Sequence, residues 1–174
     1  MFDMYIYQEK RDPFPGSFSI EGATGKSPTR INGVYEPTKE AQNGFPVYRK
    51  KGDGETWVEI VFKPETGWRW YLKPTANKGP DSSICFAYFQ CSEENVMLPH
   101  DCSSWHVSTA DGFKEQPTVV KLASNAPIPS SVTAQFKEGL KNVKERRDTR
   151  RAEVRNVIGL RYIHLFSCKT RIFV

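Results

Sequence analysis

The chain has 174 residues, of which 38% are hydrophobic and 13% aromatic, and it carries a formal net charge of +5. This length suits one domain with an appendage, and the hydrophobic content excludes an intrinsically disordered chain. The sequence has no apolar run of about 18 residues, which excludes a membrane-spanning helix, and residues 1–16 lack the features of a secretory signal. We therefore expect a soluble cytoplasmic protein, with the cytoskeleton or another large assembly as candidate settings.

The charge is distributed unevenly along the chain. Residues 1–130 hold 14 Lys and Arg against 16 Asp and Glu, a net of −2, whereas residues 131–174 hold 11 against 4, a net of +7. This asymmetry predicts an acidic partner for the C-terminal part, either a protein surface, a nucleic acid or an anionic membrane face. The alternative is a solvated helix face that binds nothing.

Residues 1–30 are predicted to form an extended N-terminal arm. They contain Pro13, Pro15 and Pro28 together with several glycines and serines, and few apolar residues follow Ile6. From residue 31 onward, short runs of β-branched and aromatic residues alternate with turn formers, which is typical of an antiparallel sheet. The β-rich module is therefore predicted to span residues 31–122.

The fold class expected for this module is mainly β, an antiparallel sheet or barrel-like single domain. Its clearest hairpin joins residues 56–62 to residues 68–72 across a Pro- and Gly-containing turn. One face of the first strand carries Trp57, Glu59 and Val61, and the other face is wholly apolar. The residues predicted to lie in the core are Val58, Ile60, Phe62, Leu72 and Phe86.

Several short motifs run through this module. They are Ile31-Asn32-Gly33-Val34-Tyr35, Asn43-Gly44-Phe45-Pro46-Val47-Tyr48, Trp57, Trp70-Tyr71-Leu72-Lys73-Pro74-Thr75 and Lys78-Gly79. In these motifs the chain resembles a tryptophan-rich β module of uncharacterised proteins from kinetoplastids and other protists. The resemblance covers residues 31–121 and implies a β fold, with no known function to carry over.

The C-terminal part begins with a predicted linker over residues 123–130, whose last residue, Ser130, is suited to cap a helix. Residues 131–174 are predicted to form a basic tail that is helical or extended. Its first half has an apolar stripe at helical spacing, formed by Val132, Phe136, Leu140 and Val143. Its end, residues 157–174, is apolar again, so we expect it to fold back as a strand or to dock on a partner.

Five residues of the tail are predicted to bind a partner. Phe136 and Leu140 would supply burial, whereas Lys144, Arg147 and Arg151 share one basic row at positions i, i+3 and i+7. Charge would steer the encounter, and apolar contact would hold the complex together. We therefore expect a protein partner with an acidic surface and rank nucleic acid below it.

Four tryptophans are candidates for a ligand-binding platform, because aromatic rings on a sheet face can stack on sugars or bases. They are Trp57, Trp68, Trp70 and Trp105. The alternative interpretation is that they fill the core, as most tryptophans do in a domain of this size.

One group of side chains contains enough soft ligands for a zinc ion: Cys85, Cys91, His100, Cys102 and His106. Their spacings match no familiar zinc-binding pattern, in which ligands usually pair two to four residues apart. We therefore expect no metal and no cofactor, and the sequence leaves open whether the five residues meet in space. Cys85 and Cys91 lie in an apolar run and are interpreted as small core residues.

No catalytic constellation can be assigned either. The chain has no Gly-x-Ser-x-Gly elbow, and the segment that ends in Gly25-Lys26-Ser27 has Ile20 where a phosphate loop requires its first glycine. The leading hypothesis is a noncatalytic protein-interaction or structural module, a component of a larger assembly. The alternative is a β domain that binds carbohydrate or another ligand through surface tryptophans.

Overall fold

The computed structural model describes residues 16–92, 96–122 and 130–169, with side chains of the last segment described as far as Arg155. Its strands and helices, in chain order, are β1 (Phe18–Glu21), α2 (Pro28–Ile31), β2 (Gly33–Gln42), β3 (Phe45–Lys50), β4 (Thr56–Lys63), β5 (Gly67–Pro74), β6 (Ala87–Gln90), β7 (Ser104–Thr109), β8 (Gly112–Pro117), β9 (Val119–Leu122) and α3 (Ser130–Lys169). Two short 3₁₀ turns, η1 (Thr75–Asn77) and η2 (Pro99–Asp101), follow β5 and precede β7.

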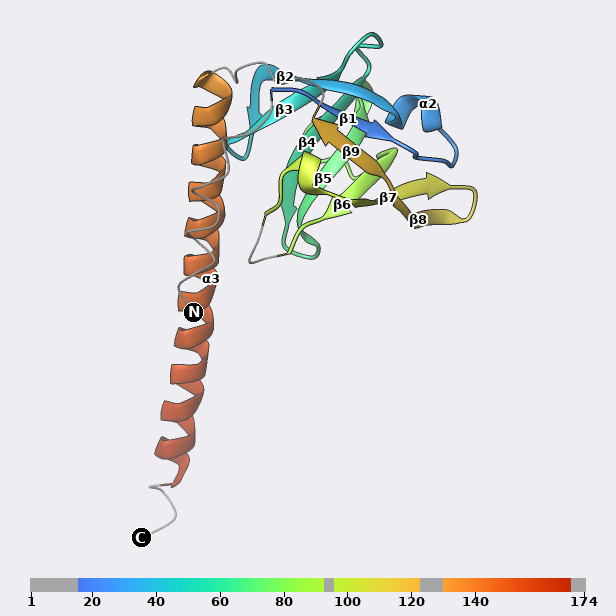
Figure 1. Ribbon diagram of the computed structural model, residues 1–174. Coiled ribbons are helices and arrows are strands. Elements are labelled where there is room, and N and C mark those ends of the chain that lie inside the picture. Colours follow the sequence, from blue (N-terminus) through green and yellow to red (C-terminus); the bar gives the residue numbers. More distant parts are fainter. Residues whose placement is uncertain (1–15, 93–95, 123–129, 170–174) are drawn as a thin grey trace.

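The described strands form one antiparallel sheet in the order β8-β7-β6-β5-β4-β3-β2-β1-β9. The sheet curls into a half-barrel, and α3 stands beside it (Figure 1). Only Thr118 separates β8 from β9, so one bent stretch of chain pairs with β7 at one end of the sheet and with β1 at the other. This architecture confirms the prediction of a mainly β, barrel-like domain with a C-terminal helix.

The sheet begins earlier than the sequence predicted. β1 lies between β2 and β9, and its Phe18 and Ile20 are fully buried. The interpretation of residues 1–30 as an arm outside the module is therefore wrong for residues 18–21, where two alternating apolar residues sufficed to form a strand. Residues 1–15 lie outside the described part of the chain.

The β4–β5 hairpin has the predicted core face. Val58, Ile60 and Leu72 are fully buried, and Phe62 and Phe86 pack against the same cluster. Phe62 of β4 is directly opposite Trp68 of β5, close to the turn of the hairpin. The alternation of side chains along β4 therefore identified its core side correctly.

The opposite face of β4 is also buried, which the sequence did not predict. The chain that follows β5 folds back across it and closes it over a buried ion pair, in which Lys73 Nζ lies 2.9 Å from Glu59 Oε1. The Gly79 N–H donates to the same Glu59 oxygen over 2.8 Å, and Lys73 Nζ donates to the Gly79 carbonyl over 2.6 Å. Because each charge has its partner and a backbone hydrogen bond, the pair can stay desolvated.

Helix α3 docks on the tip of the β2–β3 hairpin through two glycines. Asn43 and Gly44 both have positive φ, 52° and 82°, as a two-residue I′ turn requires. A Cβ at Gly44 would lie 2.8 Å from Gly139 N, and a Cβ at Gly139 would lie 2.5 Å from the Phe45 ring. The absence of side chains at both positions therefore allows the helix backbone to approach the hairpin closely.

The apolar stripe of α3 packs against the sheet from this docking point. Val132 and Val143 are buried, and the ring of Phe136 meets that of Phe45 edge-on, with centroids 5.8 Å apart. The helix then continues to Lys169, so residues 157–169 extend it instead of forming the strand considered above. Residues 123–129 of the predicted linker lie outside the described ranges.

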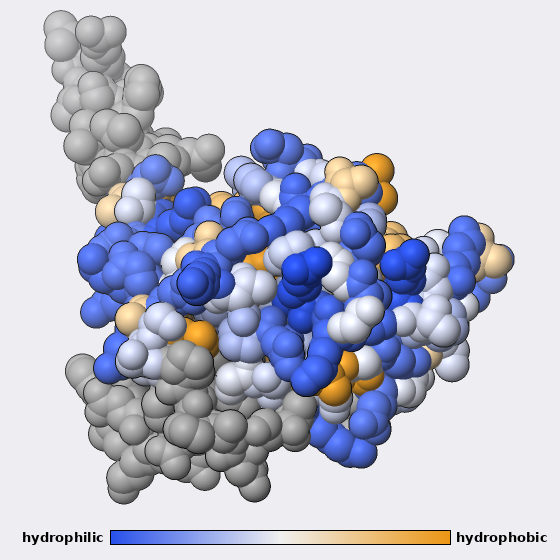
Figure 2. Space-filling view, turned by 90° about the horizontal axis from the view of Figure 1, so that it is seen from above, coloured by the Kyte–Doolittle hydropathy of each residue, from blue (hydrophilic) through white to orange (hydrophobic). Residues whose placement is uncertain are grey.

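The surface is largely hydrophilic. In the view from above, hydrophobic residues form small separate patches (Figure 2). Among the described residues, the large hydrophobic side chains that stay exposed are Ile84, Phe113 and Val154. Within the same part of the chain, no helix combines the length and apolar character needed to cross a membrane.

Candidate functional site

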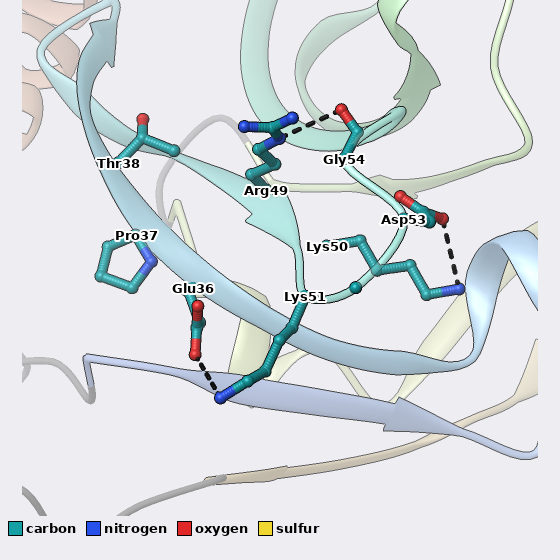
Figure 3. A pocket seen from close by; sticks show the side chains of 9 residues that line it. Glu36, Pro37, Thr38, Arg49, Lys50, Lys51, Asp53 and Gly54 are labelled. Carbon is teal, nitrogen blue, oxygen red and sulfur yellow. Dashed lines mark hydrogen bonds and ion pairs between the residues drawn. The ribbon is translucent and has the colours of Figure 1, made fainter.

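Two hollows in the structure are candidates for a site. The first lies over β2, β3 and the turn of residues 51–54 (Figure 3). Its charged side chains are already engaged with one another: Lys51 Nζ is 2.9 Å from Glu36 Oε1, and Lys50 Nζ is 3.7 Å from Asp53 Oδ2. Arg49 Nε donates to the Gly54 carbonyl over 3.0 Å. These contacts fasten the turn onto the sheet, so we interpret this hollow as structural.

Asp53 shows how this turn is held. Burial raises the pKa of its carboxyl group, but hydrogen bonds from Glu55 and Thr56 and the charge of Lys50 outweigh that effect, so the pKa lies below its ordinary value. Its stabilising contribution is therefore present above the ordinary carboxyl pKa and is lost as the pH falls through the lowered value. A carboxylate with these partners is a turn cap.

The second hollow, here called the arginine groove, lies between α3 and the turn end of the β4–β5 hairpin. It has a volume of about 470 Å³. Its lining residues are Phe62, Trp68, Val143, Arg146, Arg147, Arg150, Arg151, Val154 and Arg155. Five of the nine are arginines, and the remaining four are apolar or aromatic.

The base of the groove is an aromatic pair. The rings of Phe62 and Trp68 lie 5.1 Å apart, and Trp68 also meets the ring of Phe45, which in turn meets Phe136. The guanidinium of Arg146 lies 5.0 Å from the Phe62 ring centre and 5.8 Å from that of Trp68. This cation–π contact ties α3 to the hairpin at the point where the helix passes the sheet.

The wall of the groove is formed by successive turns of α3. Arg147, Arg151 and Arg155 follow one another at intervals of four residues, so they lie on one side of the helix. Val154 lies among these arginines and is 52% exposed. It adds one exposed apolar side chain to a stretch of the helix that is otherwise charged.

Among the described residues, the polar side chains that line the groove are hydrogen-bond donors. Guanidinium groups and the indole N–H of Trp68 donate and do not accept. A molecule that binds there must therefore present acceptors, preferably anionic ones, and must bring no unsatisfied donors of its own. Carboxylates and phosphates meet this condition.

The predicted partner-binding residues divide into two groups. Arg147 and Arg151 line the arginine groove, whereas Lys144 is exposed outside it. Phe136 and Leu140 are half-buried and pack on the protein's own core, which gives them a structural role, and their role as partner contacts stays a prediction. These two side chains pack on the sheet because Gly139 allows the helix backbone to lie close to Phe45.

The predicted tryptophan platform is also corrected by the structure. Trp70 and Trp105 are fully buried, Trp68 is 3% exposed and Trp57 is 9% exposed. Trp70 donates its indole N–H to the Met97 carbonyl over 2.7 Å, and Trp57 donates to the Thr75 hydroxyl over 2.9 Å. The four tryptophans are therefore core residues, and Trp68 also lines the arginine groove.

The cysteines likewise have a structural role. Cys91 and Cys102 are buried, as was expected of Cys91, and Cys85 is half-buried. Burial raises the pKa of the Cys85 and Cys91 thiols to about 12, which keeps them protonated at neutral pH. Among the residues that the structure describes, no three His, Cys, Asp or Glu side chains are grouped to hold a metal ion.

Sequence reasoning missed part of the groove. Arg146, Arg150 and Arg155 were not among the residues predicted to bind a partner, and Phe62 was assigned to the core alone. The sequence signal that could have found the groove is Val154, an isolated apolar residue 11 positions after Val143, three helical turns along the same face.

Comparison of the chain with protein-family models, with curated proteins and with solved structures yields no match in any of the three. The resemblance to the tryptophan-rich protist module therefore stays a prediction.

Proposed function

We propose that this chain is a noncatalytic protein-interaction module that binds an acidic segment of a partner protein in its arginine groove, as a component of a larger assembly. The observation that carries the proposal is the composition of the groove: among the described residues that line it, five are arginines, and they stand beside an aromatic and aliphatic base. Arginine suits this role because its planar fork pairs bidentately with carboxylates.

The apolar part of the groove favours a protein over a nucleic acid. Val154 and the edge of Phe62 offer surface that an apolar side chain of a partner can cover, whereas a phosphate backbone would leave it unused. In such an interface the charges steer and orient the partner, and the apolar contacts supply most of the affinity. The combination matches a protein segment that carries both acidic and apolar residues.

The chemistry of the groove supports binding without catalysis. Guanidinium groups remain protonated at any physiological pH and do not act as nucleophiles or general bases. The described cysteines are free, and this supports a reducing compartment such as the cytoplasm as the place of interaction. The burial of all four tryptophans counts against the carbohydrate alternative, which relied on surface tryptophans.

The proposal predicts salt-sensitive binding of an acidic polypeptide. Fluorescein-labelled poly-L-glutamate of about 20 residues should bind the full chain, and Arg151→Glu with Arg155→Glu should weaken binding by tenfold or more, equivalent to about 1.4 kcal/mol. Fluorescence anisotropy at two salt concentrations measures both effects.

A matched control separates the groove from general charge. Lys137→Glu with Lys144→Glu makes the same charge change on exposed positions of α3 outside the groove, and it should leave binding within about threefold of the original. Equal loss in both variants would overturn the proposal. So would tighter, Arg151-dependent binding of a single-stranded RNA of the same length, since the groove would then be a phosphate site.

A further inference from the structure

The sheet ends in a strand, β8, whose outer edge pairs with no other strand among the described residues. β8 is exposed at five of its six positions, and it lies with β7 in a hairpin on the side of the domain away from α3 (Figure 1). We propose that β8 is a second docking site, at which an extended segment of another protein adds to the sheet as an antiparallel strand. The segment carries a basic, an acidic and an apolar residue in succession.

Hydrogen bonds of the neighbouring strand show which backbone groups of β8 face outward. Ser108 of β7 donates its N–H to the Phe86 carbonyl over 2.9 Å and accepts the Lys26 N–H over 3.0 Å, so it directs neither group at β8. Opposite residues of an antiparallel pair either exchange both hydrogen bonds or exchange none, and the two kinds alternate. Phe113, which lies opposite Ser108, and Glu115 therefore direct their N–H and carbonyl groups away from β7. These are the groups that an added strand would use.

The side chains beside this edge are one apolar and two charged groups. Phe113 is 43% exposed, and its ring centre lies 5.2 Å from that of Tyr88. Glu115 is exposed on the same face of the sheet, and Lys114 belongs to the opposite face because successive side chains of a strand alternate. Lys114 Nζ lies 2.9 Å from Asp111 Oδ2, an exposed pair of small energy that leaves the lysine accessible. An added strand therefore meets an apolar, a basic and an acidic side chain in succession.

The charges of β8 disfavour pairing with a second copy of the same strand. A symmetric antiparallel pair that uses the outward groups of β8 must centre on Phe113, Lys114 or Glu115. Centring on Lys114 or on Glu115 sets that residue directly opposite itself, and centring on Phe113 sets Glu115 opposite Asp111. Each register thus places like charges opposite one another, which destabilises a strand pair. Charges of this kind protect a sheet edge from self-association and leave it open to a partner with opposite charges.

The same charges specify the segment that fits. Opposite Glu115, Lys114 and Phe113, an antiparallel strand favours a basic, an acidic and an apolar residue, in that order along its own chain. β-branched residues on either side would favour the extended conformation. Because β8 and the arginine groove lie on different sides of the domain, this inference goes beyond the proposed function (Figure 1). One chain would then connect two proteins, as a component of an assembly does.

The first test compares two fluorescein-labelled, capped peptides of the same composition. The matched peptide is Thr-Thr-Lys-Glu-Val-Thr-Thr. The control peptide, Thr-Thr-Glu-Val-Lys-Thr-Thr, separates its charges, so no register places both opposite their complements on β8. The full chain should bind the matched peptide about fivefold more tightly, because cross-strand charge pairs and apolar pairs each contribute modestly. Fluorescence anisotropy measures both affinities.

The second test isolates the backbone of the edge. Glu115→Pro removes an outward N–H and is compatible with the fold, because proline is tolerated in an edge strand where its nitrogen faces solvent. Glu115→Thr is the matched control, since it loses the same carboxylate and keeps the N–H. Binding of the matched peptide should be at least about tenfold weaker in Glu115→Pro than in Glu115→Thr. In the unsubstituted chain, the amide hydrogens of Phe113 and Glu115 should exchange rapidly and become protected when the matched peptide is added.

The outcomes separate this inference from the proposed function. Arg151→Glu with Arg155→Glu should leave binding of the matched peptide unchanged, and Glu115→Pro should leave binding of poly-L-glutamate unchanged. Equal binding of the two peptides, or binding of neither, would overturn the inference and leave the arginine groove as proposed. Protection of the Phe113 and Glu115 amides without peptide would show that the edge is already covered and would also overturn it. So would dimerisation in sedimentation that Glu115→Pro abolishes, because the occupant would then be a second copy.

Discussion

Two stretches of α3 present the same face of the helix to different surroundings. Residues 130–143 pack on the β2–β3 hairpin and bury Val132 and Val143, whereas residues 146–155 pass the end of the β4–β5 hairpin and continue beyond the sheet (Figure 1). The first stretch is apolar on that face, and the second is arginine-rich. The composition of the face changes where the sheet stops covering it, so the first stretch serves stability and the second carries the groove proposed above as a binding site.

The largest expected effect lies in the docked stretch. Phe136→Ala with Leu140→Ala should lower the free energy of unfolding by about 3–5 kcal/mol, because both half-buried side chains leave cavities against the Phe45 and Trp68 cluster. Urea denaturation followed by tryptophan fluorescence measures the loss. An unchanged urea midpoint would show that residues 130–143 of α3 do not pack on the sheet in solution. The two stretches of the helix would then not differ in their surroundings.

A smaller effect tests how closely the helix is docked. Gly139→Ala should destabilise the protein by about 1–3 kcal/mol, although alanine is the better helix former, because its Cβ would meet the Phe45 ring. At exposed Ala134 the reverse substitution, Ala134→Gly, should cost about 1 kcal/mol from helix propensity alone. Opposite substitutions should thus change thermal stability in the same direction. A stabilised Gly139→Ala variant would mean that the helix backbone lies farther from the Phe45 ring than the structure places it.

The smallest effect lies in the arginine stretch and has the opposite sign. Arg151→Gln removes repulsion from Arg147 and Arg155, each four residues away, and should raise stability by up to about 1 kcal/mol at low salt. The gain should vanish at high salt, and Lys137→Gln serves as the comparison on the docked stretch. Thermal unfolding at two ionic strengths measures the change in stability of both variants. A loss of stability in Arg151→Gln would identify that arginine as a structural residue.

Several features of the fold could be predicted from the sequence because they depend on local chemistry. Alternation along β4 identified Val58 and Ile60 as core residues. Helical spacing identified the stripe that contains Phe136. Each of these signals lies within one element and its immediate neighbours.

The remaining features depend on contacts between distant segments. Glu59 has the sequence position of a solvent-facing residue, and only the return of the chain near Gly79 buries it with Lys73. The arginine groove requires that the β4–β5 turn lie beside residues 146–155 of α3, some 80 positions later in the chain. Trp68 and Arg151 were both singled out from the sequence, but no pattern in it indicated that they border one groove.

The contact between Gly139 and the β2–β3 hairpin also fixes the directions in which the later side chains of α3 point around the helix axis. Each residue turns a helix by about 100°, so the direction of the arginines is fixed by the docking point that precedes them. One residue inserted after Val143 would swing all five arginines away from Phe62, whereas seven inserted residues would restore their direction to within about 20° and shift them along the axis. The hairpin therefore fixes the direction of the proposed binding surface further along the helix.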